Sequence, residues 1–373
     1  MLTPLDDSLW HQLPTTFDHV GTSDPRFFDR LWFAASDPRG GSTLQFTMGV
    51  YQNMNVVDGG VVVVVDGKQH NLRVSRQLRP TYETTCGPLR IEIAEPLKHV
   101  RLHIAHDDFQ GELDWRATLP PQEERQHYRR SAGRVIEDYS RYDQVGICSG
   151  WLELAGTRLK LDEWWACRDH SWGVRERVGI AEPRTGETPP PTGGLFSFLF
   201  YSTDLFGGHI QVARGTDRTR YLSAAILDRA TGATRWIGDS AEIEADFVDD
   251  TRPRRMKTAV FDVTATNGEK TRIQVEAAGP SLAMPGLGYG GYHDGLGLGV
   301  WRGIQHLEAE IWDVSHHAEV RYPDGVVGRP VHRIQPVRVI QHTSDGTSKG
   351  FGSLTFIAEG PLDELAIRTS AAR

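Results

Sequence analysis

Alternation of apolar and polar residues with a period of two runs through most of this 373-residue chain and limits the folds it can adopt. Successive side chains of a β-strand point to opposite faces of a sheet, so each alternating segment predicts a strand with one apolar face. No long segment shows the 3.6-residue period of an amphipathic helix. Clear alternation occurs in residues 44–50, 100–104 and 273–277. We therefore expect an all-β fold.

Residue pairs that end in glycine separate many of these segments and predict tight hairpin turns. Glycine, and to a lesser degree Asn and Asp, tolerates the positive φ that such turns require. Many short strands joined by turns are typical of β-sandwiches and up-and-down barrels. The pairs are Asp58-Gly59, Asp66-Gly67, Ala155-Gly156, Thr231-Gly232, Asn267-Gly268, Asp324-Gly325 and Asp345-Gly346.

One segment breaks the strand pattern and predicts a linker. Residues 181–194 are rich in proline and glycine and contain almost nothing to bury. We expect this linker to join one β domain, residues 1–180, to a second, residues 195–373. The length of the chain agrees with two domains that each bury a core of their own.

Charge and cysteine content exclude several classes of protein. The 41 Lys and Arg residues against 49 Asp and Glu give a net charge of -8, so we expect no nucleic-acid partner. The longest apolar run, residues 61–65, is too short to span a bilayer, and the amino terminus does not resemble a secretory signal. Three separate cysteines, Cys86, Cys148 and Cys167, form no disulfide framework, which favours a cytoplasmic location.

The run CRDHSWGVR, residues 167–175, places an acid, an imidazole, an indole and two guanidinium groups after a predicted strand. Unbroken alternation puts Asp169 on the inward face and His170 on the opposite face, whereas a bulge at the Trp164-Trp165 pair would reverse the two. A carboxyl group in an apolar interior has a raised pKa and can donate a proton near neutral pH. The structural alternative is an Asp–Arg–His network that seals the end of a barrel.

The motif Asp169-His170-Ser171-Trp172-Gly173 ends the first predicted β domain and precedes the linker and the second. In this layout the chain resembles the AttH/carotenoid 1,2-hydratase-like family of two-domain, lipocalin-like (calycin) proteins. Relatives in that family include hydratases that add water to isolated alkenes and fungal cyclases that fold polyenes. The resemblance implies two lipocalin-like antiparallel β-barrels packed side by side. It also implies an apolar pocket in or between them, with Asp169 and His170 near it.

A glycine-rich stretch that begins at residue 285 carries a second group of candidates. It contains a GxGxxG match, but the following YHDGLGLG cannot form the helix that a dinucleotide site requires. The stretch is either a lid that carries a proton donor or a flexible connection between two strands. The side chains it presents are Tyr289, Tyr292, His293 and Asp294.

The strand after this stretch has an ambiguous orientation. Alternation places Leu307 and Ile311 on one face and Glu308 on the other. Polar residues usually face water on a half-exposed strand. A barrel that holds a ligand can instead line its interior with a few polar groups. Glu308 would then be a base that matches an acid from the first domain.

The remaining candidates either serve the fold or line a pocket. Tyr51 and Asn53 precede a predicted turn, where Asn usually serves the turn itself. Indoles normally pack in cores, but a ring of them around a cavity would stabilise a carbocation by cation–π attraction. The indoles in question are Trp165, Trp172 and Trp301. No recurring metal-ligand spacing and no GxSxG motif occurs, so we expect neither a metal nor another cofactor.

Together these patterns predict a cofactor-independent hydratase or dehydratase that acts on an apolar, isoprenoid-like or aromatic small molecule. Asp169 would protonate the alkene or the leaving hydroxyl, and His170 would orient or reprotonate it. Glu308 or Asp294 would activate or accept water. The alternatives are an isomerase or cyclase on the same scaffold and a carrier that binds apolar ligands without chemistry. Whether the chain forms a homodimer is left open.

Overall fold

The regular structure of the chain is almost entirely β-strand. The computed structural model describes residues 3–7, 9, 13–131, 133–179, 193–215 and 219–369. This part of the chain contains no α-helix, and no helix long and apolar enough to cross a membrane. Its helical turns are the 3₁₀ segments η1 (Pro4–Asp7), η2 (Gln52–Met54) and η3 (Met284–Leu287). The predicted all-β fold is confirmed. The predicted linker, residues 181–194, lies almost wholly outside the described residues.

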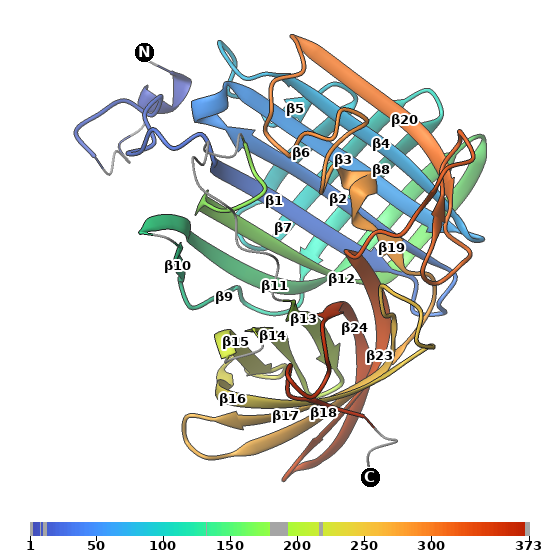
Figure 1. The fold of residues 1–373 in the computed structure, drawn as a ribbon. Coiled ribbons are helices and arrows are strands. Elements are labelled where there is room, and N and C mark those ends of the chain that lie inside the picture. Colours follow the sequence, from blue (N-terminus) through green and yellow to red (C-terminus); the bar gives the residue numbers. More distant parts are fainter. Residues whose placement is uncertain are drawn as a thin grey trace.

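A large sheet of fifteen strands occupies the upper part of Figure 1. Its order is β22-β21-β20-β4-β3-β2-β1-β12-β11-β8-β7-β6-β5, and β9 and β10 also pair with β11. The sheet curls, so that β5 at one end comes close to β3 and β4. The strands are β1 (Phe27–Ser36), β2 (Ser42–Tyr51), β3 (Val56–Val65), β4 (Lys68–Gln77), β5 (Thr85–Cys86), β6 (Leu89–Glu95), β7 (His99–His106), β8 (Phe109–Ala117), β9 (Gln122–Glu123), β10 (His127–Ser131), β11 (Arg134–Leu154), β12 (Thr157–Val174), β20 (Gln305–Asp313), β21 (Val320–Arg321) and β22 (Val327–Gly328).

The second sheet lies below the first and forms a closed barrel (Figure 1). Closure follows because β15 pairs with β14 on one side and with β16 on the other. The remaining neighbours run β13-β24-β23-β18-β17, with β19 and β25 paired at the margins. The strands are β13 (Gly194–Thr203), β14 (Phe206–Arg214), β15 (Thr219–Asp228), β16 (Thr234–Phe247), β17 (Met256–Ala265), β18 (Lys270–Ala277), β19 (Leu282–Ala283), β23 (Arg333–Thr343), β24 (Gly346–Glu359) and β25 (Ile367–Arg368).

Three strands from the second half of the chain belong to the first sheet. Strand β20 pairs antiparallel with β4 and places Glu308 opposite Arg73, while β21 and β22 extend the same edge. The chain then returns to the barrel through β23. The division into domains at residues 181–194 therefore stays a prediction, and β20 to β22 lie with the first sheet rather than with the barrel.

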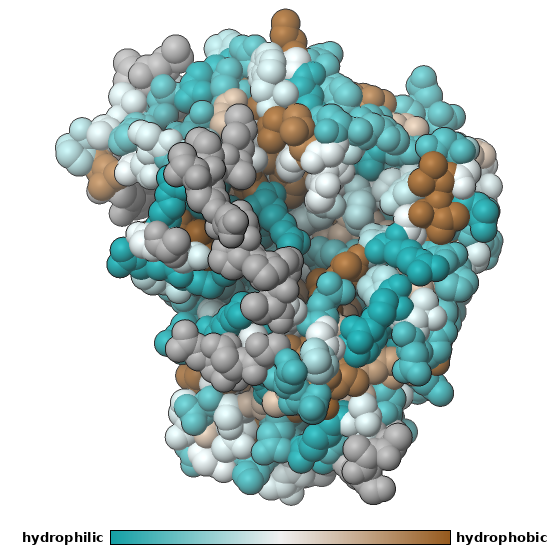
Figure 2. Space-filling model, in the orientation of Figure 1, coloured by the Kyte–Doolittle hydropathy of each residue, from teal (hydrophilic) through white to brown (hydrophobic). Residues whose placement is uncertain are grey.

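An apolar cluster joins the sheet to the barrel. The rings of Trp32 and Phe200 lie 5.8 Å apart, and the Trp165 indole nitrogen donates a 3.0 Å hydrogen bond to Ser202 Oγ. In the space-filling view the surface is hollowed between the sheet and the barrel (Figure 2). The buried members of this interface cluster include Trp32, Val62, Val145, Trp165, Cys167, Phe198, Phe200, Leu227 and Ile334.

Most of the predicted turn pairs connect neighbouring strands, but Asp58-Gly59 does not. Both residues lie inside β3, so this prediction of a hairpin is wrong. Asp58 is fully buried and accepts a 2.7 Å hydrogen bond from Arg30. A strand therefore continues through the pair because a buried cation, rather than a turn, satisfies the carboxylate.

A β-bulge in β12 decides which way the motif at residues 169–173 faces. Opposite Ser149 the strand carries two residues, Asp162 and Glu163, and Glu163 has a φ of 48°. The extra residue shifts the alternation, so Trp164 packs inside the curled sheet while Trp165 faces the barrel. Unbroken alternation is thus wrong here, and the reversal arises just before the tryptophan pair.

Replacing Trp165 with Ala should destabilise the protein by about 3–5 kcal/mol, because it empties a large site in the interface cluster. Ser202→Ala removes only the hydrogen-bond acceptor of the indole and should cost about 1 kcal/mol. Urea unfolding followed by circular dichroism measures both changes. Equal effects of the two variants would mean that packing at Trp165 contributes little to the junction.

Candidate active site

The face of the first sheet that is turned toward the barrel carries several charged residues. In the register of the sheet, Asp169 on β12 stands between Trp32 on β1 and Asp143 on β11. Two residues further along β12, Ser171 stands between Arg30 on β1 and Arg141 on β11. Directly opposed residues of antiparallel strands project to the same side, so this face combines aromatic, acidic and cationic groups.

Asp169 is half-buried, and its carboxyl group makes no hydrogen bond or ion pair with any other described residue. Burial raises the pKa of its carboxyl group, and the charges of Arg141 and Arg175 only partly oppose that rise. An indole on β1 and a second carboxyl group on β11 flank Asp169 in the sheet.

Beside Asp169 lies a fully buried cluster of Glu124, Asp143 and His209, whose ligand atoms lie within 4.8 Å of one another. Two carboxylates this close cannot both stay ionised in a buried site. Burial and then the Glu124 charge raise the pKa of Asp143 well above its ordinary value, and neutral Asp143 donates a hydrogen bond to Glu124. His209 Nδ1 lies 3.2 Å from Asp143 Oδ2, and burial lowers the pKa of this imidazole to about 4.

Glu124 is the charged member of this carboxyl pair. Burial would raise its pKa, but Arg141, with Nη1 3.4 Å from Oε1, and a hydrogen bond from His127 lower it. His127 Nε2 lies 2.5 Å from Oε2, and the Tyr221 hydroxyl donates to the same oxygen at 3.0 Å. The Gln211 amide nitrogen lies 3.0 Å from both oxygens. Donors therefore surround Glu124, whereas neither oxygen of Asp143 accepts a hydrogen bond from another described residue, so the one proton of the pair belongs on Asp143.

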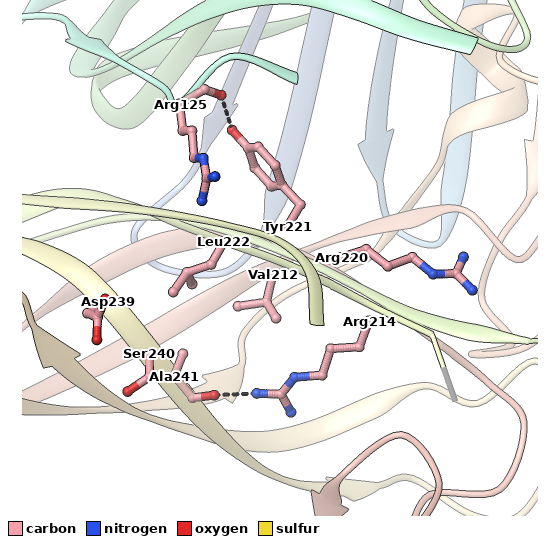
Figure 3. Close-up of a pocket in the computed structure, with 9 residues that line it drawn as sticks. All are labelled: Arg125, Val212, Arg214, Arg220, Tyr221, Leu222, Asp239, Ser240 and Ala241. Carbon is pink, nitrogen blue, oxygen red and sulfur yellow. Dashed lines mark hydrogen bonds between the residues drawn. The ribbon is translucent and has the colours of Figure 1, made fainter. Parts of the chain in front are cut away.

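A surface pocket of about 250 Å³ is lined by Tyr221, which contacts Glu124, and by residues of β14 to β16 (Figure 3). Tyr221 forms part of its wall and stacks on the ring of His127 at 3.9 Å. Its hydroxyl also donates to the Arg125 carbonyl oxygen at 2.5 Å. Tyr221 thus separates the pocket from the buried carboxylates.

A second buried group surrounds Tyr51, one of the predicted pocket residues. Arg30 Nη1 donates to the Tyr51 hydroxyl at 2.5 Å and to Asp58 Oδ1 at 2.7 Å. The backbone N–H of Gly299 donates to Asp58 Oδ2 at 2.6 Å and ties the glycine-rich stretch to β3. Gly299 has a φ of 72°, and a Cβ there would lie 2.3 Å from the Tyr51 ring, so only glycine fits.

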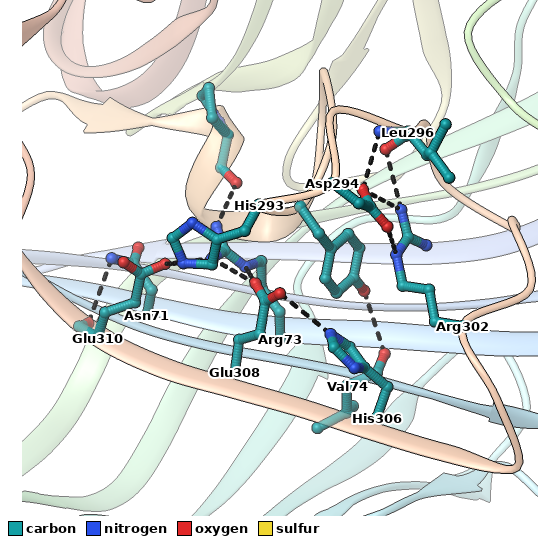
Figure 4. A network of polar contacts seen from close by, with 12 residues as sticks. Asn71, Arg73, Val74, His293, Asp294, Leu296, Arg302, His306, Glu308 and Glu310 are labelled. Atoms are coloured by element: carbon teal, nitrogen blue, oxygen red, sulfur yellow. Dashed lines mark hydrogen bonds and ion pairs between the residues drawn. The ribbon is translucent and has the colours of Figure 1, made fainter.

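Glu308 shares a sheet face with Arg73, the face that η3 covers, and not the face of the curled sheet's core. Arg73, which is almost fully buried, contacts Glu308 Oε2 at 2.7 Å and also pairs with Glu310 (Figure 4). His306 Nε2 lies 3.0 Å from the other oxygen of Glu308. The apolar residues of β20 face the other way, and Leu307 is 45% exposed. Strands β4, β3, β2 and β1 separate β20 from β12, so the structure does not place Glu308 beside Asp169.

Charged residues of the glycine-rich stretch belong to the network of polar contacts around Arg73. His293 Nε2 lies 3.1 Å from Glu310, and Asp294 pairs with Arg302 at 2.7 Å (Figure 4). Burial would raise the pKa of Asp294, but the hydrogen bonds from Arg302 and the backbone lower it. Tyr292 is buried beneath Arg302 and donates to a backbone carbonyl. Asp294 is therefore an ionised partner of Arg302.

Two groups of described side chains bring three metal-ligating residues together, Glu124–Asp143–His209 and His293–Glu308–Glu310. In the first, protein donors already surround the oxygens of Glu124. In the second, the guanidinium group of Arg73 occupies the space between the two carboxylates. A cation would have to displace Arg73 in the second group. In the first it would have to displace donors only from Glu124, because neither Asp143 nor His209 Nδ1 accepts a hydrogen bond from another described residue.

His170 and Trp172 lie on the face of β12 opposite to Asp169. His170 Nε2 pairs with Asp29 at 2.6 Å, and its ring packs edge-on against Trp172. Trp172 is 39% exposed and lines a groove of about 400 Å³. Gly173 has a φ of 132°, and a Cβ there would lie 2.3 Å from a carbonyl oxygen of β11. The side chains of the motif therefore lie on both faces of the sheet, and the structure does not bring the side chains of His170 and Asp169 together.

The remaining predicted residues have separate locations. Asn53 is exposed and donates to the carbonyl oxygens of Thr22 and Asp24, which is a structural role. Trp301 is 43% exposed. Tyr289 is half-buried, and its ring covers the guanidinium group of Arg30 at 5.4 Å. Tyr289 and Tyr51 therefore lie near the same arginine.

Comparison with known proteins adds a family and a fold. Residues 2–361 match a family of unknown function, DUF8625. The chain belongs to this family. No curated protein matches it. Among solved structures it is similar to kievitone hydratase from Nectria haematococca, with a TM-score of 0.50, 10% identity and coverage of 88% of both chains. It is also similar to CghA with Sch210972, with a TM-score of 0.51, 10% identity and coverage of 90% of this chain and 89% of that one. At this identity the likeness establishes a shared fold.

Replacing Asp143 with Asn should flatten the fall in stability with rising pH. A group whose pKa is raised on folding stabilises the native state while it is protonated and loses that contribution as pH rises through the raised pKa. Wild type should therefore lose up to about 1.4 kcal/mol per pH unit through this group above about pH 4, and the variant should not.

Urea unfolding at a series of pH values measures this difference, with exposed Asp107→Asn as the matched control. If Asp143→Asn and Asp107→Asn kept the same pH slope as wild type, the shared proton would be absent.

Proposed function

We propose that this protein is a hydratase or dehydratase that acts on an apolar small molecule at the junction of the sheet and the barrel. One observation carries the proposal: Asp169 is a partly buried carboxyl group with a raised pKa and no partner among the described residues. It lies between an indole and a second carboxyl group. Structural acids are usually paired when buried, so an unpaired one favours catalysis.

In the hydration direction, neutral Asp169 transfers its proton to one alkene carbon, whose π electrons form the new C–H bond. The other carbon becomes cationic, and the face of Trp32 stabilises it. Water then forms a C–O bond to that carbon, and its surplus proton returns to the ionised Asp169 carboxylate. The net reaction adds one water molecule to the double bond. The reverse sequence removes water from an alcohol.

The fold supports this proposal in a second way. The chain is similar in fold to kievitone hydratase, and the DHSWG motif resembles the AttH/carotenoid 1,2-hydratase-like family. The first of these proteins is named as a hydratase, and the second comparison is with a family that includes hydratases. The buried aromatic rings of Trp32, Phe198 and Phe200 in the interface cluster would suit contact with an isoprenoid-like or aromatic substrate. No step of this mechanism needs a cofactor.

The proton balance at the site also assigns roles to its neighbours. The Glu124–Asp143 pair keeps one proton and one charge next to Asp169, so it holds the local field nearly constant during the reaction. His170 lies on the opposite face of β12 and pairs with Asp29. It therefore provides a matched control in the same motif.

Turnover in water enriched in heavy oxygen tests the function. Wild type and Asp169→Asn would be incubated with terpenoid and aromatic alkenes and alcohols, and the products followed by mass spectrometry. We expect label in the wild-type product and a loss of about 100-fold or more in Asp169→Asn, because general acid catalysis contributes at least that much. His170→Gln should retain most of the wild-type rate.

Three results would contradict the proposal. An Asp169→Asn variant that turns over at the wild-type rate would remove the acid from the mechanism. A skeletal change without label would identify an isomerase or cyclase. Ligands recovered unaltered across the whole panel would identify a carrier.

A further inference from the structure

Arg175, the last residue of the run CRDHSWGVR, is a cation without a counter-ion among the described residues. It is half-buried, and its guanidinium carbon lies 4.6 Å from the centre of the Phe28 ring. No hydrogen bond or ion pair joins it to another described residue. A half-buried guanidinium group normally gains hydrogen bonds from carboxylates or carbonyls, so its donors are available to a ligand.

Arg30 offers a second set of free donors. Its side chain is 2% exposed, and Nη1 makes all of its hydrogen bonds, to Tyr51 and Asp58. Nε and Nη2 are buried and have no partner. These two nitrogens form one edge of the guanidinium plane, and their parallel N–H bonds match the two oxygens of a carboxylate. Leaving such donors unpaired destabilises the protein unless a ligand pairs with them.

The two arginines belong to the same part of the sheet face. The guanidinium group of Arg175 lies over the ring of Phe28. Phe28 is two residues before Arg30 on β1, and residues two apart in a strand share a face. Tyr289 covers Arg30 from the glycine-rich stretch, and its ring lies 5.7 Å from the ring of His332. Burial, and then the charges of Arg177 and Arg175, lower the pKa of His332 to about 4. His332 is therefore neutral near pH 7 and adds no further positive charge to this face.

The carboxylates nearby neutralise Arg30 but leave Arg175 without a counter-charge among the described residues. Asp58 is already bound by Arg30 Nη1 and by the Gly299 N–H. Burial favours the neutral form of Asp169, although Arg175 is among the charges that oppose it. With Asp58 balancing Arg30, Arg175 leaves an excess of positive charge on this part of the face. An apolar ligand alone would not explain that excess.

We propose that the substrate carries an acidic oxygen group, a carboxylate or an acidic enol or phenol, which binds between Arg175 and the free edge of Arg30. This inference rests on the proposed function, because it describes the same site. Trp32 lies two residues beyond Arg30 on the same face, a distance of about 7 Å along the strand. The acidic group then anchors one end of the molecule while the reacting carbons lie against Trp32 and Asp169. Tyr289 would have to move to admit the ligand to Arg30.

A matched pair of ligands tests this inference without any turnover. The probes are geranic acid, a ten-carbon isoprenoid acid, and its methyl ester, which has the same apolar body without the charge. Binding to the full chain at pH 7 is measured by quenching of tryptophan fluorescence and by calorimetry. We expect wild type to bind the acid at least tenfold more tightly than the ester. Arg175→Gln should lose most of that preference and leave the affinity for the ester unchanged.

Two further variants separate the site from a general effect of charge. Arg30→Lys keeps the positive charge but lacks the paired N–H donors, so it should lose several-fold of the acid preference. Arg338→Gln removes an exposed charge from the barrel and should keep the full preference. Thermal unfolding checks that each variant is folded.

Equal binding of acid and ester by wild type, or no binding of the acid, would overturn the inference. So would a preference that survives in Arg175→Gln, or one that is lost equally in Arg338→Gln. These outcomes are independent of the function. A chain that hydrates neutral alkenes but does not prefer the acid would contradict only the anionic substrate. A chain that prefers the acid but performs no reaction would contradict only the hydratase.

Discussion

Removal of charged groups from water at the junction of the two sheets is the constraint on which the rest of this structure depends. The barrel and the glycine-rich stretch together cover a sheet face that carries Arg30, Asp58, Arg141 and Asp143, all of them almost fully buried. Each such group must gain a counter-charge, share a proton or bind a ligand, because an isolated buried charge is too costly to keep. The protein uses the first two solutions for most of these groups, and the groups left over define the candidate site.

Charged groups that have partners and charged groups that lack them lie close together on this sheet face. Asp58 is satisfied by Arg30 and a backbone N–H, and Glu124 by Arg141, His127 and Tyr221. Between these saturated pairs lie Asp169, Arg175 and one edge of Arg30, which lack partners in the described part of the chain. Saturated neighbours hold their side chains in place, so the free groups are presented by a rigid surface. Such preorganisation is what general acid chemistry and anion recognition both require.

The sequence predicts the strands well and the orientation of individual side chains less well, for identifiable reasons. Alternation locates strands because it reflects burial of one face, as at residues 44–50. It fails at Asp162-Glu163, where one extra residue in a bulge reverses every side chain that follows. Asp58-Gly59 has the composition of a turn, yet a cation 28 residues away in sequence makes it part of a strand. Glu124, Asp143 and His209 were not predicted, because no local spacing relates residues that only the packing of sheet on barrel brings together.

The composition of the run CRDHSWGVR follows from the same geometry. Strand alternation sends Asp169, Ser171 and Gly173 toward the barrel and sends His170 and Trp172 to the other side, where Asp29 binds the imidazole. A dense polar motif on one strand therefore need not be one site. The acid remains unpaired because its sequence neighbour, the imidazole, lies on the other face and binds Asp29, whereas the charge of Arg175 is close enough to act on the pKa of Asp169. Alternation thus separates a base from an acid that would otherwise neutralise each other, and leaves the acid to face the junction.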